Sequence, residues 1–206
     1  MRLFVAIELP QNLKSLLSQV QADLKTAVPD DWKITWVTPE KMHLTVQFIG
    51  GVEKQRLNEI IMSLQRATFG VAPFELDLSP LNFFPAVRPR VILVEAGGQL
   101  DIYQKLQNRV RQELEATDCQ LVSKTAPHVT LGRIKKLEGE LPKEKWIRLA
   151  EKHLKDASEF VVDRVSLIQS TPTSEGSIYR TLISLALKNK SNLYKLVGKA
   201  NPTPKI

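Results

Sequence analysis

Two short segments of the sequence carry the same pattern, a histidine and a threonine separated by one aliphatic residue: His43-Leu44-Thr45-Val46 and His128-Val129-Thr130-Leu131. Side chains alternate between the two faces of a strand, so the histidine and threonine of each segment share one face while the aliphatic residues point into a core. If the two strands lie side by side, two imidazoles and two hydroxyls converge on one patch. Such a patch can provide a general acid, a general base and hydrogen bonds to a phosphate group.

Cleavage of a phosphodiester needs two proton transfers, and a pair of histidines can perform both. The ordinary histidine pKa is about 6.5, so one ring can be protonated while the other is neutral. Each transfer typically contributes about 10²–10⁴-fold in rate, and the hydroxyls of Thr45 and Thr130 can hold the phosphate between the rings. A catalytic zinc commonly uses three protein ligands, whereas the motifs supply two histidines and no carboxylate. We therefore expect neither a metal nor another cofactor.

The elements that must position these motifs also occur twice. In the first half of the chain, hydrophobic periodicity predicts strands at 2–8, 34–37, 42–49 and 73–84, with one helix that starts at Pro10 and a second over 53–68. In the second half, it predicts strands at 91–94, 128–134, 159–169 and 178–187, with helices over 99–116 and 143–154. The offset is 87 residues at the first strands (91 minus 4) and 85 at the histidines (128 minus 43). This indicates an internal duplication, with repeats of about 1–88 and 89–188.

A duplicated unit usually packs about an approximate two-fold axis, because the same surface is present on both copies. We therefore expect the two motifs to meet at a shared site. We expect residues 1–206 to form a single bilobal domain. The segment 189–206 contains several lysines among polar residues and prolines, so fraying at this end of the chain stays open.

Composition and charge narrow the class of protein. Hydrophobic residues make up 43% and charged residues 25% of the chain, which is typical of a soluble globular protein. The 29 Lys and Arg residues against 22 Asp and Glu give a net charge of +7, which favours anionic partners such as RNA or phosphorylated metabolites, although this signal is not specific. A single cysteine, Cys119, cannot form an internal disulfide and fits a reducing compartment.

The chain starts with an apolar run of five residues before Glu8, which is too short for a signal peptide or a membrane span. We expect a cytoplasmic protein with no membrane contact, and a monomer. The third histidine, His153, lies in a charged helical end and is expected to be a solvated surface residue.

The sequence resembles the two-histidine phosphoesterases, and within them the RNA 2′,3′-cyclic phosphodiesterases that were first described as 2′-5′ RNA ligases. The resemblance spans nearly the whole chain. It is carried by Arg2-Leu3-Phe4-Val5-Ala6-Ile7-Glu8-Leu9-Pro10, by the stretch from Trp36 to Gly50, by Phe84-Pro85 with Arg88-Pro89-Arg90-Val91, and by Pro127-His128-Val129-Thr130-Leu131-Gly132-Arg133.

The resemblance implies a compact bilobal α+β fold, with an antiparallel sheet and outer helices in each lobe and an active cleft between the lobes. It further implies metal-independent opening of an RNA 2′,3′-cyclic phosphate to a 2′-phosphate. The partners would be RNA ends or nucleotides that carry this group. We assign His43 as the acid and His128 as the base.

The resemblance also adds binding residues. Arg133 would hold phosphate or stack on a base, yet strand parity puts it on the face of Val129 and Leu131, so reaching the site requires a bulge, a twist or the end of the strand. Phe84 and Tyr179 are candidates for stacking on a nucleobase, although an aromatic in such a position can equally belong to the core. The lysines at 135 and 136 could attract a phosphate backbone or simply be solvated.

Three alternatives stay open. The same acid and base could join a cyclic phosphate to a 5′-hydroxyl in 2′-5′ ligation, although water should outcompete an RNA hydroxyl that is not held in place. Other cyclic or 2′-5′ nucleotides could be the substrate. From a different class, the chain could be a non-catalytic RNA- or nucleotide-binding module, although both histidines and both threonines are present.

Overall fold

The structure is a computed structural model, and it describes residues 1–117, 119–122, 126–155, 158–174 and 176–189. The strands are β1 (Arg2–Glu8), β2 (Lys33–Trp36), β3 (His43–Gly51), β4 (Phe74–Phe84), β5 (Val91–Gly98), β6 (His128–Lys136), β7 (Phe160–Val162), β8 (Arg164–Thr173) and β9 (Gly176–Ala186). The α-helices are α1 (Gln11–Thr26), α2 (Leu57–Thr68), α3 (Leu100–Glu115) and α4 (Lys143–Leu154), with short 3-10 turns η1 (Pro39–Lys41) and η2 (Lys54–Arg56). Residues 190–206 of the predicted tail lie outside the described residues.

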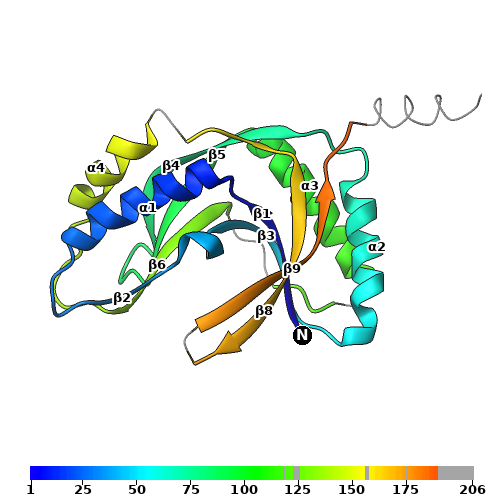
Figure 1. The fold of residues 1–206 in the computed structure, drawn as a ribbon, viewed down its shortest axis with the longest axis horizontal. Coiled ribbons are helices and arrows are strands. Elements are labelled where there is room, and N and C mark those ends of the chain that lie inside the picture. The colour runs from blue at the N-terminus through cyan, green and yellow to red at the C-terminus, as the bar shows by residue number, and fades with distance from the viewer. Residues whose placement is uncertain (118, 123–125, 156–157, 175, 190–206) are drawn as a thin grey trace, which may run out of the picture.

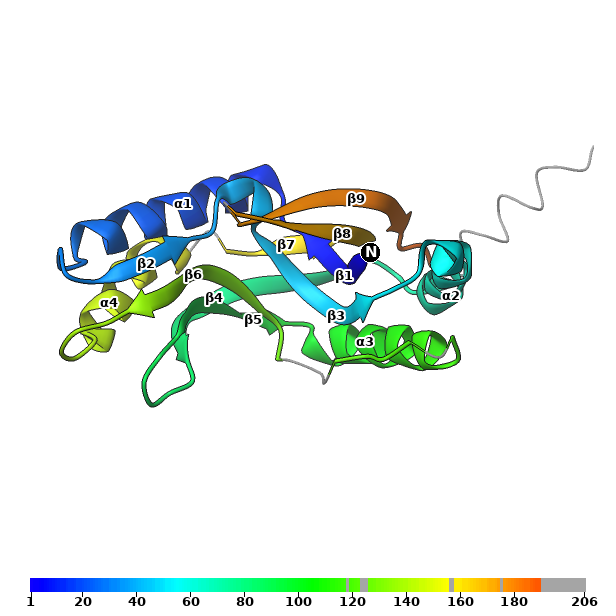
Figure 2. The same ribbon diagram turned by 90° about the horizontal axis from the view of Figure 1, so that it is seen from below.

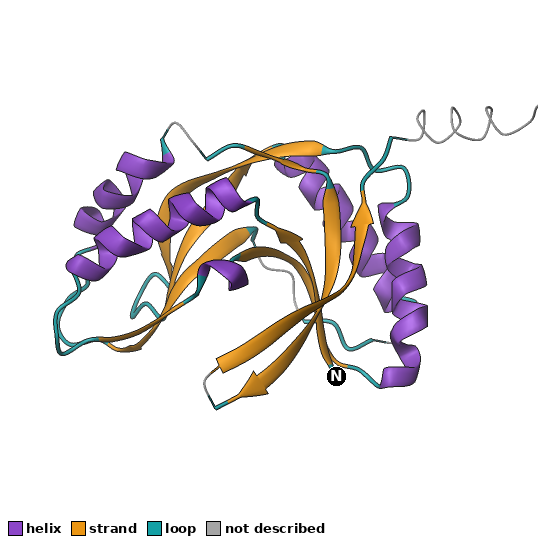
Figure 3. Cartoon of the chain, in the orientation of Figure 1, coloured by secondary structure: helices purple, strands orange, loops and turns teal. Residues whose placement is uncertain are grey.

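The described strands form one curled, antiparallel, nine-stranded sheet. Its order is β7-β4-β5-β6-β3-β1-β8-β9, and β2 is attached through β6. Helices α1 and α4 pack together over the half that contains β6, and α2 and α3 pack together over the half that contains β3 (Figures 1 and 2). The expected mixed fold of antiparallel strands with helices outside is confirmed (Figure 3).

The two halves of the sheet draw on both halves of the sequence. Strands β1 and β3 of the first repeat pair with each other and, through β1, with β8 and β9 of the second. Strand β4 of the first repeat crosses to pair with β5 and β7 of the second. The two halves of the sequence are therefore interleaved, and each half of the sheet contains strands from both of them.

One predicted strand is wrong as a single element. The stretch 159–169 contains β7, which pairs with β4 in one half of the sheet, and β8, which follows Asp163 and pairs with β1 in the other half. Both pieces contain β-branched residues, and a single residue, Asp163, separates them, so periodicity does not mark the switch.

The helices bury the stripes that their sequences predict. In α1, for example, Leu13, Leu17, Val20 and Leu24 are fully buried at three- and four-residue spacing. The predicted helix over 53–68 begins as η2 and continues as α2. Among the described residues, no helix is both long enough and apolar enough to span a membrane.

Candidate active site

The two motif strands meet at one residue pair. Leu44 of β3 pairs with Val129 of β6 in antiparallel orientation, and both side chains are fully buried. In an antiparallel pairing, the residue before one partner faces the residue after the other. His43 therefore lies in register with Thr130, and His128 with Thr45. We call the surface that carries these four side chains the histidine face.

Both histidines use the same hydrogen bond to fix the imidazole. The Nδ1 atom of His43 lies 2.7 Å from the carbonyl oxygen of Lys41, and that of His128 lies 2.8 Å from the carbonyl oxygen of Ala126. A carbonyl oxygen only accepts, so Nδ1 carries the proton in each ring. Each Nε2 is thereby left as the atom that can take up or release a proton.

Aromatic rings enclose His43. Its centroid lies 4.9 Å from that of Phe4 and 5.5 Å from that of Tyr179, and the Tyr179 ring meets the imidazole edge-on. Phe4 also belongs, with Ala6 and Ile168, to a small buried cluster separate from the main core. This enclosure removes water from around the imidazole.

The burial of His43 lowers its pKa below the ordinary value, and the charge of His128 lowers it further, with a smaller contribution from Lys14. The hydrogen bond to the Lys41 carbonyl and the charge of Glu8 act in the opposite direction. Burial therefore favours the neutral imidazole of His43 more than it would be favoured in an exposed histidine. An anionic phosphate bound nearby would raise this pKa and favour the protonated ring.

The threonines lie where they can contact a bound phosphate. The Oγ1 atom of Thr45 lies 3.1 Å from Nε2 of His43. Thr130 is half-buried on the same face, and so is His128. The structure thus brings together the four motif side chains that the sequence predicts.

A bulge in β6 brings Arg133 to the histidine face. Leu93 of β5 pairs with Thr130, whereas the adjacent Ile92 pairs with Gly132, so β6 has one extra residue at this point. The extra residue reverses the alternation of side chains. Arg133 is exposed on the side of Thr130, which resolves the parity conflict in the sequence.

Strand β3 has a bulge at the same position of its motif. Ala6 of β1 pairs with Thr45, whereas the adjacent Val5 pairs with Gln47, so Val46 is the extra residue. Phe48, which corresponds to Arg133 in the repeat, therefore lies on the histidine face, where it is 40% exposed and its ring centroid is 6.0 Å from that of Phe4. Phe48 is absent from the predicted site. If the two motifs are aligned and the alignment is continued past the fourth residue, Phe48 stands opposite Arg133. This correspondence could have identified Phe48 from the sequence.

Two buried glutamines from the outer helices hold the backbone at these bulges. Gln21 of α1 donates Nε2–H bonds to the carbonyl oxygens of Leu131 (2.7 Å) and Val37 (2.8 Å). Gln107 of α3 donates to the carbonyl oxygen of Val46 at 3.0 Å. The two glutamines are 86 residues apart in the sequence, and Val46 and Leu131, whose carbonyl oxygens they bind, are 85 residues apart. The same helix-to-strand contact therefore occurs in both halves of the chain. These residues were also missed, and a polar residue inside each apolar helix stripe is the signal for them.

A carboxylate accompanies each histidine in the sheet register. Glu8 of β1 pairs with His43, and Glu95 of β5 pairs with His128. Asn82 donates its amide to Glu95 at 2.6 Å. The two carboxylates are 87 residues apart (95 minus 8), the same offset as the first strands of the expected repeats, and they were not predicted.

The two aromatic candidates lie at different places. Tyr179 of β9 is 37% exposed beside His43. Phe84 ends β4, is 65% exposed and pairs with Val91, which in turn pairs with Arg133. Phe84 is thus associated with the arginine rather than with the rings around His43.

The remaining predicted residues lie at the periphery. His153 is half-buried rather than fully solvated, because its Nε2 lies 3.0 Å from Oδ2 of Asp23. Lys135 and Lys136 are exposed at the end of β6, and Lys136 forms an ion pair with Glu138. Across the part of the chain that the structure describes, no group of three or more His, Cys, Asp or Glu side chains is arranged to hold a metal ion.

Comparison with known proteins gives a consistent result. The family model described as LigT like Phosphoesterase matches residues 7–93 and 99–179. The RNA 2′,3′-cyclic phosphodiesterase of Thermotoga maritima is 31% identical over 183 residues, covering 88% of this chain and 93% of that protein. The protein of the same name from Methanothermobacter thermautotrophicus is 30% identical, covering 86% of this chain and 94% of its own.

Among solved structures, TT0787 of Thermus thermophilus superimposes with a TM-score of 0.72 at 26% identity, covering 92% of this chain and 100% of that one. Escherichia coli LigT in complex with 3′-AMP shares the fold, with a TM-score of 0.64 at 20% identity over 91% of this chain and 98% of LigT. On the match to the family model and to the Thermotoga protein, the chain belongs to the LigT-like phosphoesterase family.

Proposed function

We propose that this protein is an RNA 2′,3′-cyclic phosphodiesterase that opens the cyclic phosphate to a 2′-phosphate without a metal ion. The observation that carries the proposal is the pairing of Leu44 with Val129, which puts two histidines with equivalent Nδ1 hydrogen bonds on one face. The names of the relatives from Thermotoga and Methanothermobacter support the substrate.

In the proposed reaction, one neutral imidazole takes a proton from a water molecule through Nε2, and the water oxygen bonds to phosphorus. The bond from phosphorus to O3′ breaks, and the other imidazole, protonated at Nε2, gives its proton to O3′. The products are a 2′-phosphomonoester and a free 3′-hydroxyl. After the two transfers, the ring that acted as the base is protonated and the ring that acted as the acid is neutral. Proton exchange with solvent returns both rings to their starting states.

We assign the proton donor to His43 and the base to His128. Burial lowers the pKa of His43 in the free protein, and the negative charge of a bound substrate would raise that pKa and favour the protonated ring that the donor role needs. Glu8, paired with His43 in the sheet, acts in the same direction because its negative charge favours the imidazolium.

Thr45, Thr130 and Arg133 are proposed to hold the non-bridging phosphate oxygens. All three lie on the histidine face, and an arginine can donate two parallel hydrogen bonds to a phosphate. Phe84 and Tyr179 are proposed to stack on nucleobases, because both present exposed aromatic surface.

The experiment is hydrolysis of an RNA with a 2′,3′-cyclic phosphate end in the presence of EDTA. We expect wild type to convert it, and His43→Ala or His128→Ala to lower kcat by at least about 10²-fold, the typical contribution of one proton transfer. His153→Ala is the matched control, because this histidine bonds to Asp23 away from the motifs. Tight binding of the RNA by wild type without conversion from pH 5 to 8 would instead identify a binding module.

The setting of this activity is part of the proposal. We propose that the enzyme is a monomer in the cytoplasm, where the single cysteine remains reduced. Light scattering of the purified protein tests the first point, and fractionation of cells that express the chain tests the second.

A further inference from the structure

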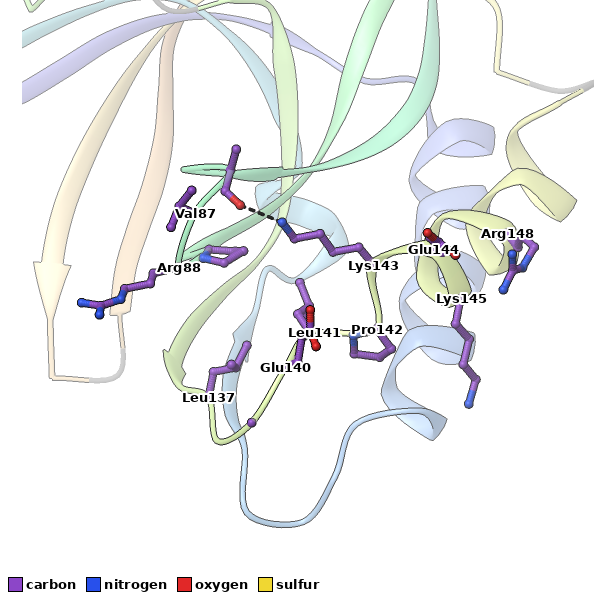
Figure 4. Close-up of a pocket in the computed structure, with 13 residues that line it drawn as sticks. Val87, Arg88, Leu137, Glu140, Leu141, Pro142, Lys143, Glu144, Lys145 and Arg148 are labelled. Atoms are coloured by element: carbon purple, nitrogen blue, oxygen red, sulfur yellow. Dashed lines mark hydrogen bonds between the residues drawn. The ribbon is translucent and has the colours of Figure 1, made fainter.

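A basic groove opens at the end of the sheet beyond Arg133. It is a cavity of about 750 Å³ between the β4–β5 turn, residues 86–89, and the segment 137–148 that leads from β6 into α4. Figure 4 shows the two walls and the side chains that line them. The lining includes four cationic side chains, Arg88, Lys143, Lys145 and Arg148, and two carboxylates, Glu140 and Glu144.

The walls of this groove are tied together. Nζ of Lys143 donates to the carbonyl oxygen of Ala86 at 2.7 Å, which links α4 to the turn (Figure 4). At the base of the turn, the amide of Arg90 donates to the carbonyl of Phe84 at 2.8 Å, and the amide of Ile134 donates to the carbonyl of Arg90 at 2.9 Å. These hydrogen bonds hold the walls of the groove relative to each other.

The groove begins close to Arg133 along the strands. Phe84, Val91 and Arg133 are neighbours across β4, β5 and β6, and the turn 86–89 starts directly after this row. Leu137, in the opposite wall, follows Arg133 by four residues, which is about 13 Å at the rise of a strand. A few nucleotides of an extended strand cover this distance.

The two repeats differ in charge at this point. Positions 133, 135 and 136 of β6 are Arg, Lys and Lys, whereas the equivalent positions 48, 50 and 51 of β3 are Phe, Gly and Gly. The duplicated frame therefore has a basic exit on the β6 side and an aromatic surface on the β3 side. A polyanion bound at the histidines is attracted toward the β6 side.

We propose that this groove binds the phosphate backbone of the nucleotides that precede the cyclic end, so that an RNA strand is held more tightly than a mononucleotide. The inference rests on the proposed function, because the RNA whose backbone would lie in the groove is the substrate proposed above. Lys145 and Arg148 are exposed one turn apart on α4, where they can follow successive phosphates. The carboxylates at 140 and 144 leave the lining with a net positive charge.

The test compares two substrates, a short oligoribonucleotide with a 2′,3′-cyclic end and a nucleoside 2′,3′-cyclic phosphate. We expect wild type to have a higher kcat/KM for the oligonucleotide, and K145Q/R148Q to lower that value on the order of 10-fold through KM. Because only the preceding nucleotides are proposed to occupy the groove, kcat/KM for the mononucleotide should not change. The salt dependence of log KM for the oligonucleotide should also weaken, by about 0.7 for each phosphate that the variant no longer neutralises.

The matched control is K54Q/K105Q, which removes two exposed charges from η2 and α3 and should leave both substrates unaffected. The proposal is overturned if wild type shows no preference for the oligonucleotide, or if K145Q/R148Q keeps both the preference and the salt slope. A wild-type protein that hydrolyses neither substrate would instead refute the proposed function, so the two failures are distinguishable.

Discussion

Leu44 and Val129 form the residue pair that joins β3 to β6, and with them the two halves of the sheet. This pair lies between the row that contains His43 and the row that contains His128. Both side chains are fully buried in the main core. The histidines are thus positioned by core packing below them and by the carbonyl oxygens of Lys41 and Ala126 beside them. This arrangement predicts how the site responds to specific changes.

Replacement of the buried glutamine in α3 should loosen the bulge that follows Thr45. Gln107→Leu removes the hydrogen bond to the Val46 carbonyl, and an unsatisfied buried group costs about 1–3 kcal/mol. We expect a lower free energy of unfolding in urea and a lower kcat. Gln104→Leu, at an exposed position of α3, is the control, and equal behaviour of the two variants would contradict a positioning role.

The acid and base can be separated with a substrate in which sulfur replaces O3′. A thiolate leaves without being protonated, so this substrate bypasses the general acid but still needs the base. We expect His43→Ala to regain most of its rate with the thio substrate and His128→Ala to regain none. If only His128→Ala regains its rate, the acid is His128 and the assignment is reversed. If neither variant regains its rate, neither histidine is the proton donor.

The His43 imidazole should titrate below the ordinary value of about 6.5 in the free protein, because its burial disfavours the charged ring. Glu8→Gln removes a negative charge that favours the imidazolium, so the pKa should fall further. NMR titration of the histidine ring signals measures both shifts. Glu95→Gln, beside His128, should leave the pKa of His43 nearly unchanged. A His43 pKa that rises in Glu8→Gln would refute this electrostatic description.

Arg133 should be required for substrate turnover but not for folding, because it is exposed. Loss of charge-assisted hydrogen bonds to phosphate costs about 1.5–3 kcal/mol, so Arg133→Gln should lower kcat/KM about 10- to 100-fold. Arg133→Lys should recover part of this loss, since it restores the charge but not the paired donors. Arg180→Gln, at an exposed position of β9, provides the comparison in the same assay and in thermal unfolding.

The sequence predicts the motif strands and a shared face for the histidine and threonine of each motif, because alternation is a local rule. The meeting of the two motifs is expected only from the repeated order of the elements. The sequence does not predict the face of Arg133, since the bulge before it depends on pairing with β5 and on the hydrogen bond from Gln21. The division of 159–169 into β7 and β8 is equally non-local, because it depends on which strand each piece meets.

The most direct test of the central claim is the reaction of an RNA 2′,3′-cyclic phosphate in oxygen-18 water with EDTA, followed by phosphorus NMR. The account predicts a 2′-phosphomonoester that carries one labelled oxygen with wild type, and unchanged cyclic phosphate with His43→Ala or His128→Ala. A 3′-phosphate product, no reaction with wild type, or undiminished conversion by either variant would contradict it.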